Sequence, residues 1–132
     1  MLTVVRRGDG SPSERSKGPY TGEMWRDILQ ADDAGNSFGR VFFTPCARTH
    51  WHSHPGGQLL IVEHGEALVG DENGTVRLRT GDMVWTPPNT RHWHGATDGQ
   101  SMMHLAVTFG GAEWAEEVPD AYYDGANHDA TD

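Results

Sequence analysis

The stretch "HWHSH", residues 50–54, carries three histidines on alternate positions, and "RHWHGA", residues 91–96, carries two more. In an extended strand the side chains alternate between the two faces, so the histidines of each stretch point the same way. Neutral imidazole nitrogen is a common ligand for zinc, copper, iron and nickel. The two stretches therefore predict a metal site, if the fold brings their strands together.

Two further polar residues extend this pattern. Gln58 follows His54 by four residues, and we expect the intervening Pro55-Gly56-Gly57 to bend the chain and return the amide toward the histidines. In "MMHLAVTF", residues 102–109, His104 lies on the face that carries small and polar residues, whereas the other face is wholly apolar. Such a strand can line a ligand cavity with one face and pack against a second sheet with the other.

The elements that must position these side chains are short strands. Between residues 37 and 109, apolar runs rich in Val, Leu, Phe and Trp alternate with turn sequences, which is typical of an all-β barrel or sandwich. The Asn73-Gly74 pair between two such runs predicts a β-hairpin, because both residues tolerate positive φ. Only "GAEWAEEV", residues 111–118, looks helical, and the small, acidic residues 124–132 are expected to be disordered.

Length and composition limit the architecture. A chain of 132 residues is long enough for one domain with a hydrophobic core. We expect residues 1–19 to form an N-terminal arm or edge strand, residues 20–118 the barrel, and residues 119–132 an acidic C-terminal tail. The single cysteine, Cys46, excludes an internal disulfide.

Charge and hydropathy restrict the partners. The formal net charge is −9, whereas nucleic acids and anionic membranes require a basic patch, so we expect neither as a partner. No apolar run has the length of a signal peptide core or a transmembrane helix, which favours a cytoplasmic protein. A small molecule or another protein is the expected partner.

Two segments resemble the two sequence motifs of the cupin family. "HWHSHPGGQLLIVEHG" is similar to the first motif and "GDMVWTPPNTRHWHGA" to the second, in the same order and at matching spacing. The resemblance implies a double-stranded antiparallel β-barrel of the jelly-roll type with a metal ion inside. By the register of the motifs, the implied ligands are His52, His54, Gln58 and His92. The chain departs from the common cupin pattern, which has Glu, Gly and Asn, at Gln58, Asn89 and Ala96.

Within the cupins, "ARTHWHSHPGGQLLIV", the second motif and the later "HLA" resemble small bacterial monocupins. That group includes manganese-dependent hydroxynitrile lyases and proteins associated with carboxymuconolactone decarboxylases. The resemblance implies manganese as the ion, with zinc, iron or nickel as alternatives. It also places His94 and His104 in the pocket, either as proton-transfer groups or as hydrogen-bonding groups that orient a ligand. Cupins commonly form homodimers by sharing N-terminal strands, and a homodimer is expected here.

The amide ligand bears on the reaction. Because Gln58 is uncharged, it leaves the ion its full charge, and such an ion is a stronger Lewis acid toward a hydroxyl, a carbonyl or an anion. The leading hypothesis is a metal-dependent lyase or isomerase that acts on a small hydroxylated or carbonyl compound. Cyanohydrin cleavage is the instance that the resemblance implies. A metal-dependent dioxygenase and a non-catalytic small-molecule-binding protein are the two alternatives.

Other residues near the histidines have simpler interpretations. Alternation turns Trp51 and Trp93 away from the metal and toward a core or a partner subunit. Cys46 is interpreted as a buried strand thiol, and Arg48 as a solvated cation. His50 is expected near the rim or edge of the barrel, outside the metal site.

Overall fold

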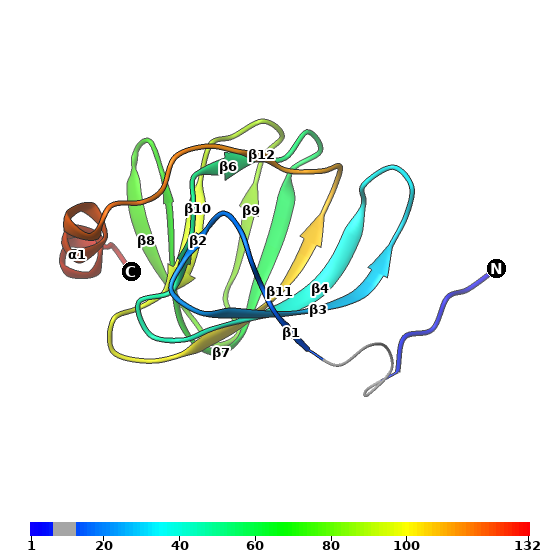
Figure 1. Ribbon diagram of the computed structural model, residues 1–132, viewed down its shortest axis with the longest axis horizontal. Coiled ribbons are helices and arrows are strands. Elements are labelled where there is room, and N and C mark those ends of the chain that lie inside the picture. The colour runs from blue at the N-terminus through cyan, green and yellow to red at the C-terminus, as the bar shows by residue number, and fades with distance from the viewer. Residues whose placement is uncertain (7–12) are drawn as a thin grey trace.

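A computed structural model describes residues 1–6 and 13–132, and this part of the chain is built mainly of short antiparallel strands (Figure 1). No helix within these ranges is long and apolar enough to span a membrane. The prediction of an all-β protein with one short C-terminal helix is confirmed. The elements are β1 (Glu14–Arg15), β2 (Tyr20–Thr21), β3 (Met24–Ala31), β4 (Ser37–Phe43), β5 (Arg48–Thr49), β6 (His52–Ser53), β7 (Gln58–Asp71), β8 (Gly74–Arg79), β9 (Met83–Thr86), β10 (Trp93–Ala96), β11 (Met102–Thr108), β12 (Glu113–Trp114) and α1 (Asp120–Asp129).

The long strand β7 connects the two layers of the barrel. Its first half pairs with β9 and β11, and its second half pairs with β8 and β10, all antiparallel. The strand order is β1-β3-β4-β11-β7-β10-β5-β2, with β8 and β9 also paired to β7, while β12 pairs with β6. Where the halves meet, Gly65 has a φ of 76°. A Cβ on this residue would lie 2.0 Å from the carbonyl oxygen of Ser101, so the bend requires glycine.

Inward-facing apolar residues of the two layers form the core. Phe43 and Met102 are fully buried and lie in one cluster with Leu60, Val62 and Ala67. Burial of one large apolar side chain contributes about 1.5–3 kcal/mol. This cluster therefore holds the two layers together and fixes the strands that carry the polar side chains.

Two segments predicted outside the histidine stretches can be compared with the structure. The hairpin predicted from Asn73-Gly74 forms between β7 and β8, with Asp71 paired to Gly74. At the N-terminus, β1 lies on the edge of β3, with Glu14 opposite Arg26. Residues 7–12 of the expected arm lie outside the described residues.

The helical prediction for residues 111–118 is wrong. Glu113–Trp114 form β12, which pairs with β6, and the N–H of Ala115 donates a hydrogen bond of 2.8 Å to the carbonyl oxygen of Trp51. Pairing with a distant strand overrides the local helical preference of this segment. The helix lies instead at Asp120–Asp129, in the tail that we expected to be partly disordered.

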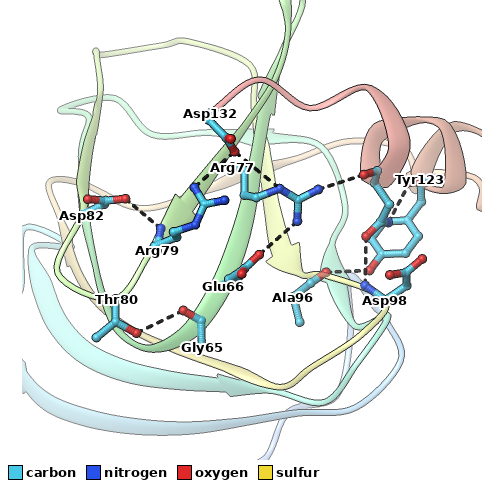
Figure 2. A network of polar contacts seen from close by, with 11 residues as sticks. Gly65, Glu66, Arg77, Arg79, Thr80, Asp82, Ala96, Asp98, Tyr123 and Asp132 are labelled. Carbon is cyan, nitrogen blue, oxygen red and sulfur yellow. Dashed lines mark hydrogen bonds and ion pairs between the residues drawn. The ribbon is translucent and has the colours of Figure 1, made fainter.

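Helix α1 is ordered because it packs on the outside of the barrel, beside β8 (Figure 1). Tyr123 and Ala126 are three residues apart, share one face of the helix and are buried in a cluster with Leu68 and Trp93. The hydroxyl of Tyr123 donates a hydrogen bond of 2.6 Å to the carbonyl oxygen of Ala96 (Figure 2). These two contacts explain a helix in a sequence that is acidic and rich in small residues.

Arg48, which we interpreted as solvated, is buried beneath this helix with 3% of its surface exposed. Its guanidinium donates hydrogen bonds to the carbonyl oxygen of Val118 at 2.8 Å and to the carboxylate of Asp120 at 2.6 Å. It also lies 4.3 Å from the ring centroid of Tyr123. A buried guanidinium requires such partners, and the unpredicted C-terminal segment supplies them. The interpretation of Cys46 is also corrected, since this residue is exposed in a turn with a φ of 72°.

Candidate metal centre

The two histidine stretches meet at one end of the barrel. His52 in β6 and His92, just before β10, exchange backbone hydrogen bonds of 2.9 Å in both directions. His54 lies two residues beyond His52, and Gln58 begins β7 after a turn at Gly57, whose φ is 86°. The structure thus brings together side chains from three segments that the motif register had grouped.

A main-chain oxygen fixes the tautomer of each of the three histidines. In each ring Nδ1 donates to a carbonyl oxygen: His52 to His50 at 2.8 Å, His54 to Gly111 at 3.0 Å and His92 to Thr90 at 2.9 Å. Because a carbonyl oxygen only accepts, Nδ1 must carry the proton, which leaves the lone pair on Nε2. One ring nitrogen of each histidine lies within 4.8 Å of the other two. The three rings are therefore oriented as convergent ligands.

The atoms at the centre of this cluster fit a bound cation. Nε2 of His54 is buried and has no hydrogen-bond partner among the described residues. Nε2 of His92 lies 3.2 Å from Oε1 of Gln58, and both atoms offer lone pairs. Buried acceptors without a partner are unfavourable, and a cation placed between them would satisfy all of them at once. Three imidazoles and one amide oxygen suit a divalent transition metal ion.

Burial keeps these imidazoles neutral. It lowers the pKa of His52 to about 2 and the pKa of His92 to about 4, and it also lowers the pKa of His54. The neighbouring His92 is the second cause of the low pKa of His52, after burial, because two positive charges would repel each other. At neutral pH the Nε2 atoms of these candidate ligands therefore carry no proton that would have to leave before a metal ion binds.

A cavity of about 200 Å³ opens beside the candidate ligands. Its wall contains His52, His54 and Gln58, the apolar side chains Met24, Ile28, Val41 and Ala106, and two arginines, Arg26 and Arg40. No carboxylate side chain is among the described residues that line it, although the chain carries 19 acidic residues. Sites for drug-sized ligands measure about 300–1,000 Å³. This cavity therefore fits a smaller, partly apolar molecule that is neutral or becomes negatively charged.

His94 and His104 form a hydrogen-bonded pair of buried rings in the wall of the same cavity. Nε2 of His104 lies 3.0 Å from Nδ1 of His94, and the ring centroids of His94 and His52 are 5.2 Å apart. Burial lowers the pKa of both rings, to about 4 for His104. Within the described part of the chain, Nε2 of His94 has no hydrogen-bond partner. That nitrogen is thus free to exchange a proton with a molecule in the cavity.

The segment before α1 contributes site residues that the sequence did not predict. The carbonyl oxygen of Gly111 orients His54, and the ring of Trp114 packs over His52 with 4.4 Å between the ring centroids. Tyr20 packs edge-on against Trp114, with 5.6 Å between their centroids. We had interpreted this segment as a helix, and a helical interpretation gives no reason to place Trp114 beside His52.

Fold and site together define a small β-barrel protein with a candidate three-histidine metal site. The sequence-family model of the cupin domain matches residues 39–109, which is more than half of the chain. The chain belongs to the cupin family. It is 41% identical over 117 residues to an (R)-mandelonitrile lyase from Granulicella tundricola, a match that covers 81% of this chain and 89% of that protein.

Solved structures share this fold. A cupin-like protein from Thermotoga maritima is 35% identical, with a TM-score of 0.79, and the match covers 96% of this chain and 98% of that one. A predicted oxalate decarboxylase from the same organism is 23% identical, with a TM-score of 0.71 over 82% of this chain and 99% of that one. At that identity the second similarity shows the fold alone.

Proposed function

We propose that this cupin is a metal-dependent hydroxynitrile lyase, which cleaves a small cyanohydrin into a carbonyl compound and hydrogen cyanide. The observation that carries the proposal is the placement of a neutral ligand cluster next to the buried His94–His104 pair in one small cavity. The similarity to a mandelonitrile lyase supports the same class of reaction.

The ion in this proposal is manganese, held by His52, His54, Gln58 and His92. A divalent ion held by three neutral imidazoles and a neutral amide would keep its full charge, and it would act as a Lewis acid toward the oxygen of a substrate hydroxyl. The amide of Gln58 matters here because a glutamate would cancel part of that charge.

The proton is moved by His94. Its Nε2 takes the proton of the substrate hydroxyl, while Nδ1–H donates to Nε2 of His104, which disperses the charge on the protonated ring. As the carbonyl forms, the bond to the nitrile carbon breaks and its electron pair leaves with cyanide. Cyanide then takes the proton from Nε2 of His94 and departs as hydrogen cyanide, which restores the neutral pair. The described residues of the cavity wall include no carboxylate that would repel the developing anion.

The test is cleavage of mandelonitrile by the purified protein. Protein stripped with a chelator and then reloaded with manganese is assayed for benzaldehyde release under air and under an oxygen-free atmosphere. We expect release only after reloading, at the same rate in both atmospheres, because the reaction consumes no oxygen.

A matched histidine variant serves as the control. His64 is exposed on β7 and lies outside the cavity wall, so His64→Ala should retain both the metal and the activity. A metal-loaded protein that leaves mandelonitrile and other small cyanohydrins intact contradicts the proposal. Turnover that stops without oxygen would instead indicate a dioxygenase.

A further inference from the structure

We propose that Thr108 is a positioning residue, which turns the amide oxygen of Gln58 toward the metal ion. This role depends on the metal site proposed above. It concerns the amide of Gln58, which has an oxygen and a nitrogen at its end. Only the oxygen can bind a cation, so the orientation of the amide matters.

The pairing of two strands places these side chains together. Thr108 is the last residue of β11 and lies opposite Gln58, the first residue of β7. Directly opposed residues of an antiparallel pair have neighbouring side chains. Nε2 of Gln58 donates a hydrogen bond of 2.9 Å to Oγ1 of Thr108, and Oε1 lies 3.2 Å from Nε2 of His92. The nitrogen end of the amide is thus held by β11, and the oxygen end lies among the ligands.

Burial makes this hydrogen bond important. Gln58 is only 5% exposed, so bulk water does not satisfy its N–H groups. When the oxygen binds an ion, the amide nitrogen must point away from the ion and needs an acceptor there. The hydroxyl of Thr108 is that acceptor. Without it, the metal-bound orientation would leave a buried donor unpaired, which is unfavourable.

The chain supplies its own control on the other side of Gln58. Thr86 of β9 is paired with Gln58 in the same sheet and is also buried, at 6% exposed. Among the described residues, no hydrogen bond joins the hydroxyl of Thr86 to Gln58. Two threonines therefore flank the ligand, and only Thr108 holds its amide.

The experiment measures the affinity of metal-stripped protein for manganese by competition with a metal-sensitive dye. Thr108→Val keeps the shape of the side chain and removes the acceptor. We expect it to weaken binding by about 10- to 100-fold, as is typical when a group that orients a ligand is lost. Thr108→Ser should restore most of the affinity, and Thr86→Val should leave it unchanged. Thermal unfolding of the metal-free variants checks that each one folds.

A double-mutant cycle separates positioning from support of the strand. In a Gln58→Ala background there is no amide to position, so Thr108→Val should cause no further loss of affinity. An equal loss in that background would overturn the proposal, as would unchanged affinity of Thr108→Val when the unsubstituted protein binds manganese. If the unsubstituted protein binds no divalent ion, the proposed function fails together with this role.

Discussion

Nδ1 of His94 and Nε2 of His104 are joined by a hydrogen bond of 3.0 Å between two buried, neutral imidazoles. Only one ring can supply the proton in this bond. If His94 is the donor, its Nε2 presents a lone pair to the cavity, and if His104 is the donor, Nε2 of His94 presents an N–H group. Cyanohydrin cleavage starts from the form with the lone pair, which takes the hydroxyl proton, and the protonated ring then returns that proton to cyanide.

This relationship predicts the effects of substituting the pair. His94→Ala should lower kcat by about 10²- to 10⁴-fold, the usual contribution of a general acid–base group. His104→Gln should lower it less, because Nε2 of His94 remains. Metal content should stay the same in both variants, as measured by elemental analysis beside steady-state kinetics. Full activity of His94→Ala would show that His94 does not transfer the proton.

Gln58→Glu should change metal affinity and turnover in opposite directions. The carboxylate adds a negative charge next to the ion, so manganese should bind more tightly, on the order of tenfold. The same charge reduces the pull of the ion on the substrate oxygen, so kcat should fall, also on the order of tenfold. Dye competition and initial rates on the loaded protein give the two quantities. A variant with higher kcat would contradict the importance of a neutral ligand.

Arg48→Met should destabilise the protein by about 3 kcal/mol, because it removes several hydrogen bonds made by a buried charged group. The bonds to Val118 and Asp120 are lost, while the carboxylate of Asp120 is exposed and becomes hydrated. Urea unfolding followed by fluorescence measures the change. Arg91→Met is the matched control, since its ion pair with Glu116 lies at the surface and should matter by less than about 1 kcal/mol. Equal effects of the two substitutions would show that burial of Arg48 is unimportant.

Tyr123 predicts a loss of stability at alkaline pH. Burial raises the pKa of its hydroxyl from 10.0 to about 12. The folded state thus holds this proton more tightly than the unfolded state, so the stabilisation is complete below pH 10 and is lost as the pH rises to about 12. Between these pH values the free energy of unfolding of Tyr123→Phe should fall less than that of the unsubstituted protein. The difference between the two should be on the order of 2 kcal/mol. Denaturant titrations from about pH 9 upward compare the two proteins. If their free energies of unfolding fall in parallel as the pH rises, Tyr123 is not the cause of the loss.

The sequence predicts the histidine cluster better than it predicts the residues around the cluster. Strand alternation is a local property, so it placed His52 and His54 on one face without any knowledge of the fold. The motif register then added Gln58 and His92, and the structure brings all four together. Alternation also correctly turned Trp93 away from the cluster, into the contact with α1.

The contacts that orient the candidate ligands could not be predicted in the same way. The carbonyl oxygen of Gly111 and the ring of Trp114 reach the site because a segment far along the chain pairs with β6. That pairing competes with a local helical preference and wins only through tertiary contacts. The burial of Arg48 depends on Val118, which lies in the same distant segment. The interpretation of Arg48 as solvated was therefore wrong for the same reason.

The central claim is that His52, His54, Gln58 and His92 hold one divalent ion, and elemental analysis of the purified protein tests it most directly. We predict about one transition metal ion per chain, retained through gel filtration, lost in His52→Ala and His92→Ala, and retained in His64→Ala, as expected of a set of buried ligands. A protein that carries no metal and takes up none when manganese, zinc, iron or nickel is added would contradict the claim.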